Sequence, residues 1–221
     1  HITEQAMTYS AKLVLQDAIE NSDLGDDLGL DSELLAAFPA AMREAHESAI
    51  LNHQLRREII ATKLANRMIN RLGLIDPFEL AEEEGCSLGE VARAFVMAER
   101  LFNADGIWRE LEVAEISEDI RITLFDRLAY VLRSHMADLM RIGVSDDRIG
   151  DTVDMLAPGV NLLNEHVQKL ITAEGRLQAA KQVKDLVKAG ATPEIADKIA
   201  NIYMNDGAAG IAFLAHSREI D

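Results

Sequence analysis

A run of basic and amide side chains in the first third of the chain has the residue types and spacing of a docking surface. Arginine, lysine and asparagine recur there at intervals of three and four residues, which places them on one side of a helix. Guanidinium and amide groups donate hydrogen bonds to carboxylates and backbone carbonyls, so this side could bind another protein domain. The candidate residues are Arg56, Arg57, Glu58, Lys63, Asn66, Arg67, Asn70 and Arg71.

The same run has a second interpretation, in which the arginines form solvated ion pairs within the chain. The candidate acidic partners are Glu44, Glu47 and the run Glu82 to Glu84. Exposed pairs contribute only about 0–1 kcal/mol each and are common on protein surfaces. Residue types alone therefore favour this interpretation, and docking remains the alternative.

The other candidate chemical motifs each lack a required feature. His46 and His53 are seven residues apart, whereas zinc-binding pairs on a helix sit three or four residues apart. His135 and Asp138 have helical contact spacing, but no nucleophile lies beside them. The glycine-rich residues 207–210 follow no strand, as a dinucleotide-binding turn would require. We therefore expect no catalytic residue, no metal site and no cofactor site in this chain.

The charge of the chain argues against two classes of partner. The net charge is −16 over 221 residues, and nucleic-acid binding needs a basic surface. A turn at Gly85 to Ser87, followed by Arg93, resembles a helix-turn-helix reader, but Glu82 to Glu84 before it would repel phosphate. No apolar run reaches the roughly 20 residues that cross a bilayer. We expect a cytoplasmic protein that binds neither nucleic acid nor membrane.

The elements that must position these residues are helical. No Gly or Pro interrupts residues 40–72, and good helix formers dominate them. They predict one helix about 50 Å long that ends at Gly73. Ser87 and Glu90 have the spacing of a capping box at the start of another helix.

The remaining apolar periodicity predicts about ten helices in all, packed along the long helix of residues 40–72. The predicted fold is therefore an all-α multi-helix bundle with no Rossmann sheet. We expect one helical domain over residues 1–221, with possible soft boundaries near residues 112–117 or 158–159. The chain begins at His1 rather than Met, and we expect it to be a piece of a longer protein.

Two blocks of sequence resemble the large bacterial NAD-dependent glutamate dehydrogenases. They are LRREIIATKLANRMINRLG at residues 55–73 and EEEGCSLGEVARAFVMAERLF at residues 82–102. The segments AKLVLQDAI at residues 11–19 and LLAAFPAAMRE at residues 34–44 fit the same region in the same order. The resemblance is to the C-terminal helical region of chains several times longer than this one.

The resemblance implies a role within a larger enzyme. That family oxidises L-glutamate with NAD and water to 2-oxoglutarate, ammonium and NADH. None of its cofactor or catalytic motifs is present here, so no such residue is carried over. The resemblance implies a non-catalytic scaffold that contacts the catalytic core of its own longer chain, in an enzyme expected to be a homo-oligomer with NAD bound elsewhere.

Two other functions stay open at this stage. One is a free-standing helical module that binds another protein through a groove. The other is the helix-turn-helix DNA reader, which the acidic charge disfavours.

Overall fold

The helical class predicted from the sequence is confirmed by the computed structural model, which describes residues 2–144 and 147–218. The described residues form twelve α-helices and two short 3₁₀ helices, and they contain no strand. Contacts divide the chain into two compact units, residues 1–94 with 145–151 and residues 95–144 with 152–221. The expectation of a single domain stays a prediction.

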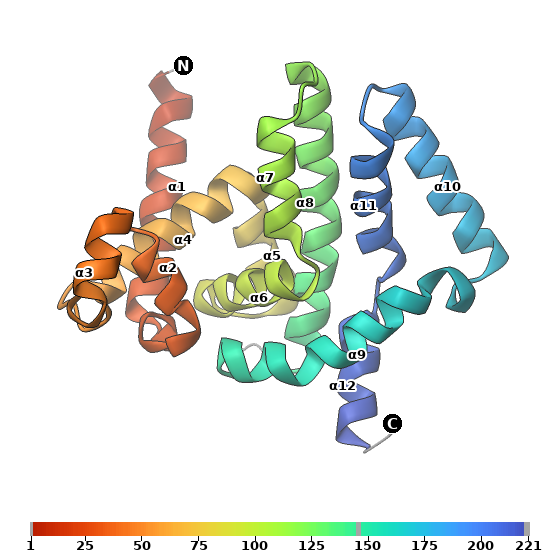
Figure 1. Cartoon of the computed structure of the whole chain (residues 1–221). Coiled ribbons are helices and arrows are strands. Elements are labelled where there is room, and N and C mark those ends of the chain that lie inside the picture. Colours follow the sequence, from red (N-terminus) through yellow and green to blue (C-terminus); the bar gives the residue numbers. More distant parts are fainter. Residues whose placement is uncertain (1, 145–146, 219–221) are drawn as a thin grey trace. The chain divides into compact units, whose positions relative to one another are not determined.

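The first unit is built on two helices that pack against each other, α1 (Ile2–Asn21) and α4 (Arg56–Leu72) (Figure 1). Between them lie the 3₁₀ helices η1 (Asp23–Asp26) and η2 (Leu28–Leu30), and then α2 (Asp31–Leu35) and α3 (Ala40–Leu51). Apolar residues on α4 recur at helical spacing and are fully buried, which builds the core of this unit. They are Ile60, Ala61, Leu64, Ala65 and Met68, and α1 contributes Leu15 and Ile19.

The prediction of one helix over residues 40–72 is wrong. The helix ends at Asn52, whose side-chain amide donates to the Ser48 carbonyl at 2.8 Å, and α4 begins at Arg56. Nδ1 of His53 accepts a hydrogen bond from the Leu55 amide at 3.1 Å. These local bonds compensate for the lost helical bonds, because side chains of this type compete with the helix for backbone groups.

The break separates two segments with different needs for burial. Residues 40–49 of α3 are all exposed, whereas α4 has a continuous buried stripe. His46 also has non-helical dihedral angles within α3, with φ −137° and ψ 27°. One continuous helix would have joined an exposed segment to a partly buried one. Helix propensity alone does not distinguish the burial of the two segments.

Two further helices follow, α5 (Asp76–Glu84) and α6 (Leu88–Leu101), and the division between the units falls within α6. The capping box at the start of α6 is confirmed. The Ser87 amide donates to Oε2 of Glu90 at 2.7 Å, and the Glu90 amide donates to Oγ of Ser87 at 3.2 Å. Residues 91–99 are buried all round the helix rather than on one face.

In the second unit, helices α7 (Ala104–Val113), α8 (Glu118–Arg141), α11 (Pro193–Met204) and α10 (Ala173–Lys188) lie in that order, each beside the next (Figure 1). Helix α12 (Ala208–Ser217) packs on α8, and α9 (Ile149–Leu170) passes close to α12. A Cβ on Gly159 would lie 2.8 Å from Cβ of Ala212, so this approach requires glycine.

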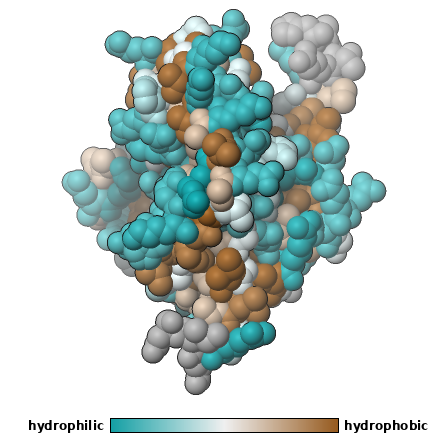
Figure 2. Space-filling model, turned by 90° about the vertical axis from the view of Figure 1, so that its right-hand side faces the viewer, coloured by the Kyte–Doolittle hydropathy of each residue, from teal (hydrophilic) through white to brown (hydrophobic). Residues whose placement is uncertain are grey.

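The surface of the second unit mixes hydrophilic and hydrophobic patches on the face that Figure 2 presents. Several large apolar side chains on its helices are exposed, among them Leu162, Leu170 and Leu177. Isolated apolar side chains of this kind are normal on a protein surface, so we assign them no function.

Candidate functional site

Arg56, the first of the predicted docking residues, is occupied within its own unit. Its Nε donates to the Gly25 carbonyl at 2.8 Å and its Nη2 to the Asp27 carbonyl at 2.9 Å. Its Nη1 lies 2.6 Å from Oδ1 of Asp31, and only 14% of the side chain is exposed. Arg56 therefore holds the 3₁₀ segment against the start of α4, because a guanidinium offers several donors in a fixed geometry.

Arg57 makes a parallel set of contacts. It donates to the carbonyls of Glu20, at 3.2 Å, and of Ser22, and its Nη1 lies 2.9 Å from Oδ2 of Asp26. A Cβ on Gly25 would lie 2.7 Å from Cγ of Arg57. Glycine at position 25 therefore allows the backbone to approach the arginine side chain.

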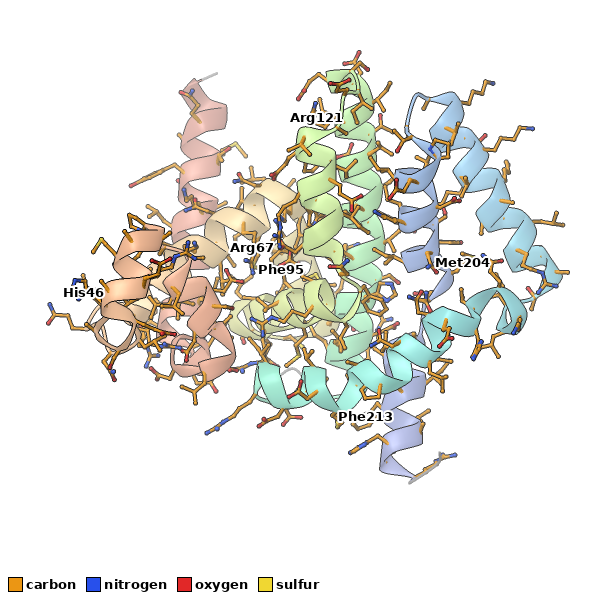
Figure 3. All side chains as sticks on the ribbon, viewed as in Figure 1. His46, Arg67, Phe95, Arg121, Met204 and Phe213 are labelled. Atoms are coloured by element: carbon orange, nitrogen blue, oxygen red, sulfur yellow. The ribbon has the colours of Figure 1, made fainter. Side chains whose placement is uncertain are left out.

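Arg67 also pairs inside its unit. Its Nη1 lies 2.7 Å from Oε2 of Glu33 on α2, and the two side chains are 19% and 16% exposed. Figure 3 labels Arg67 on α4. These three arginines therefore form ion pairs within their own unit, but those of Arg56 and Arg67 are mostly buried rather than solvated. The acids in these pairs are Asp31, Asp26 and Glu33, which the sequence did not suggest.

The other members of the predicted set lie at the surface of α4. Asn70 is exposed, and the rest are half-buried, namely Glu58, Lys63, Asn66 and Arg71. Docking of another domain on this side of α4 stays a prediction. Fewer side chains are available for such docking than the sequence suggested, because three of the arginines already bind groups in their own unit.

The structure brings together one charged pair that sequence reasoning missed. Nη1 of Arg93 on α6 lies 2.8 Å from Oδ2 of Asp27, and the two side chains are 4% and 3% exposed. Oδ2 also accepts from the Ile149 amide at 2.9 Å, and Oδ1 accepts from the Gly29 amide at 2.8 Å. Asp27 therefore joins three elements, namely η2, the first residue of α9, and α6. Nη2 of Arg93 also lies 2.6 Å from the exposed Asp23.

A signal for this pair was present in the sequence. Arg93 stands alone in the otherwise apolar stretch Val91 to Ala98. Charged residues are almost never fully buried unless they are paired, so this position predicts an acidic partner. The partner itself lies 66 residues away, and no local pattern identifies it.

A cavity of about 200 Å³ in the second unit is lined by amide side chains. Nδ2 of the buried Asn205 donates to Oδ1 of Asn164 and to the Asn201 carbonyl, both at 2.9 Å. Lys198 also lines the cavity, and its Nζ lies 2.7 Å from Glu110 and 3.1 Å from Glu194. The hydrogen bonds that Lys198 donates to Glu110 and Glu194 raise its pKa. Three of the lining asparagines bond to one another and the ammonium is paired, so we assign the cavity no ligand.

Almost the whole chain matches a known protein family. The family model described as "Glutamate dehydrogenase, C-terminal" matches residues 7–221. The chain belongs to this family of glutamate dehydrogenase C-terminal regions. The resemblance seen in residues 55–73 and 82–102 is thereby confirmed, and the family match extends it through the second unit.

Three relatives are named NAD-specific glutamate dehydrogenase. The protein of Halomonas elongata is 28% identical over 194 residues, which cover 86% of this chain and 12% of the relative. The protein of Mycobacterium tuberculosis is 30% identical over 66% of this chain and 10% of the relative. The protein of Pseudomonas aeruginosa is 33% identical over 55% of this chain and 8% of the relative. The chain thus spans about an eighth or less of the length of these relatives.

In the part of the chain that the structure describes, no helix combines the length and the hydropathy that a bilayer crossing requires.

Replacing Arg56 with alanine is expected to lower the free energy of unfolding of the first unit by about 1–3 kcal/mol, because the buried carbonyls that it bonds lose their donors. Chemical denaturation followed by circular dichroism measures the change. Both measurements use the isolated 221-residue chain, and the matched control is Asn70→Ala on the same helix, which is expected to stay within about 0.5 kcal/mol because Asn70 is exposed there. Equal effects of the two variants would contradict the structural role of Arg56.

Proposed function

We propose that this chain is the non-catalytic C-terminal scaffold of an NAD-dependent glutamate dehydrogenase. In this proposal the whole enzyme oxidises L-glutamate to 2-oxoglutarate and ammonium, water supplies the oxygen, and NAD takes the hydride. The observation that carries the proposal is the family match over residues 7–221, together with relatives about seven times longer that are named for this activity.

The fold supports a scaffold role rather than a cofactor site. Rossmann dinucleotide sites lie at the carboxyl ends of parallel strands, where a glycine-rich turn enters a helix. The described residues of this chain form helices and no strand. The proposal therefore assigns NAD and the reacting groups to the part of the enzyme outside these 221 residues.

The partner in this proposal is the catalytic core of the same long chain, within a homo-oligomer. The side of α4 that faces away from its buried stripe offers Lys63, Asn66 and Asn70, which are spaced three and four residues apart and lie at the surface. A lysine beside two amides can pair with a carboxylate and with backbone groups of another domain. Because the chain is linked to the core, docking is intramolecular and needs little intrinsic affinity.

The docking test uses the double variant Lys63→Ala with Asn70→Ala in the full-length enzyme. We expect a lower melting temperature, a smaller assembled fraction on size-exclusion chromatography and a lower turnover. The control is Lys184→Ala on α10, whose lysine is exposed and which should leave all three measurements unchanged. Wild-type stability, assembly and turnover in the double variant would rule out docking through this side of α4.

A separate assay tests the non-catalytic assignment. The 221-residue chain mixed with NAD and L-glutamate should form no NADH, while the full-length enzyme does. NADH formation by the isolated chain, with a rate proportional to its concentration, would overturn the assignment whatever the docking result.

A further inference from the structure

Three side chains that can bind a metal ion meet in the second unit, away from α4. His135 and Asp138 lie one turn apart on α8, and Asp206 lies in the turn between α11 and α12. A ring nitrogen of His135 and one carboxylate oxygen from each aspartate lie within 4.8 Å of one another. His135 and Asp138 were noted from their spacing, but Asp206 is brought to them only by the fold.

The imidazole of His135 is held in one orientation. The residue has no exposed surface, and its ring stacks on Phe102 with centroids 3.7 Å apart. Its Nε2 lies 3.0 Å from the Ile202 carbonyl oxygen. A carbonyl oxygen only accepts hydrogen bonds, so Nε2 carries the hydrogen and Nδ1 carries the lone pair.

The lone pair on Nδ1 is buried and has no hydrogen-bond partner within the described part of the chain. A buried acceptor without a partner is costly and calls for an explanation. Histidines that bind metals commonly donate their other ring N–H to a backbone carbonyl, which sets the tautomer and the ring orientation. The bond from Nε2 to Ile202 has this form.

The protonation state suits a ligand. Burial lowers the pKa of His135 from its usual 6.5, while the Ile202 bond and the charges of Asp206 and Asp138 act in the opposite direction. Burial thus favours the neutral imidazole, which is the form that binds metals. A cation would in turn offset the negative charges of the two aspartates.

The two carboxylates are also held near the imidazole. Oδ2 of Asp138 accepts from the Gly207 amide at 3.2 Å, and Oδ1 of Asp206 accepts from Oγ of Ser134 at 2.9 Å. A carboxylate has about four lone-pair sites, so each group keeps capacity for a metal. Asp206 is exposed and can move toward the other two ligands.

We propose that His135, Asp138 and Asp206 form a binding site for a divalent transition-metal ion of the Zn²⁺ type. One imidazole with two carboxylates suits Zn²⁺ better than Mg²⁺ or Ca²⁺, which take oxygen ligands only. Zn–N and Zn–O bonds of about 2.0–2.2 Å place tetrahedral ligand atoms about 3.4 Å apart. Binding therefore draws inward any ligand atoms that lie farther apart than this, and water fills the fourth position.

The ion would connect α8 to the turn before α12. His135 and Asp138 belong to one helix, whereas Asp206 lies 68 residues beyond Asp138 in the sequence. A metal that joins distant segments stabilises the folded state, because the unfolded chain does not present the same ligands. The expected effect of the ion is on stability, and the site does not depend on the scaffold proposal.

The test titrates the metal-free 221-residue chain with Zn²⁺ by calorimetry, with Mg²⁺ in parallel. We expect one Zn²⁺ per chain, a higher melting temperature and no response to Mg²⁺. Co²⁺ should give visible absorption bands of tetrahedral coordination, and the Nδ1 resonance of His135 should shift on metal binding in ¹⁵N NMR.

The matched variants are Asp206→Asn and Asp138→Asn at the site and Asp126→Asn as the control, since Asp126 is exposed on the same helix α8. Each site variant should weaken Zn²⁺ binding at least tenfold and remove the thermal shift, and the control should not. Asp206→Asn changes an exposed side chain, so it is expected to fold. Binding that survives both site variants, or that shifts no His135 resonance, would belong to surface histidines and overturn the proposal.

Discussion

Replacing Asp27 with alanine is expected to lower the free energy of unfolding of the first unit by about 3–5 kcal/mol, because removal of one partner leaves a buried charge uncompensated. The charge left behind is Arg93, whose side chain is 4% exposed. The Gly29 and Ile149 amides lose their acceptor at the same time. Asp23 still pairs with Arg93, but its side chain is 80% exposed, so it compensates little.

Hydrogen exchange with chemical denaturation measures this effect for each helix of the first unit. The matched control is Asp26→Ala, one residue earlier, whose carboxylate is 64% exposed and pairs with Arg57. Exposed pairs are worth about 0–1 kcal/mol, so the control should differ little from the wild type. A control that loses as much stability as Asp27→Ala would show that burial of the Arg93 pair does not matter.

A double variant separates the effect of the unpaired Arg93 charge from the effect of the lost Asp27 hydrogen bonds. If Asp27→Ala leaves a buried charge, then adding Arg93→Met should recover part of the lost stability, since apolar replacement of a buried pair is often neutral or stabilising. Further loss in the double variant would mean that the hydrogen bonds of Asp27 to Gly29 and Ile149 carry the effect instead.

The second large effect is expected in the core of the other unit. Replacing Trp108 with alanine should lower the free energy of unfolding of that unit by about 3–5 kcal/mol, because it removes a large buried side chain and leaves a cavity. Trp108 on α7 has no exposed surface, and its ring lies 5.0 Å from that of Phe125 on α8. Circular dichroism and hydrogen exchange follow the change without the tryptophan signal.

The control for Trp108 is Tyr130→Ala on α8. Tyr130 is 63% exposed, and surface substitutions of this kind usually stay within about 0.5 kcal/mol. Because Trp108 belongs to the second unit, protection of α1 and α4 in the first unit should fall less than protection of α7 and α8. A uniform loss across both units would show that they unfold together.

Local signals in the sequence predicted the helical class and several helix ends correctly. Gly73 ends α4 as predicted, with φ of 91°, and Gly85 and Gly190 follow the ends of α5 and α10 with φ of 67° and 109°. Positive φ is accessible to glycine because it has no Cβ, so these positions can be recognised without a structure. The capping box of Ser87 and Glu90 likewise depends on residues three positions apart.

The candidate surface on α4 was predicted in part. Helical spacing placed the basic and amide residues on one side of the helix, and most of them lie at the surface there. Spacing does not reveal which acid approaches an arginine, so the partners of Arg56, Arg57 and Arg67 were missed. Their carboxylates lie on segments that fold back onto α4 from the start of the chain.

The sequence by itself thus determined that the chain is helical, where several helices stop, and which family it belongs to. Only the tertiary structure decided that residues 52–55 break the long helix, that Asp27 pairs with Arg93, and that Asp206 reaches His135. The physical reason is the separation along the chain between the residues that interact. Caps and turns depend on backbone hydrogen bonds within a few residues, whereas buried charges and ligand clusters depend on the packing of segments far apart in the chain.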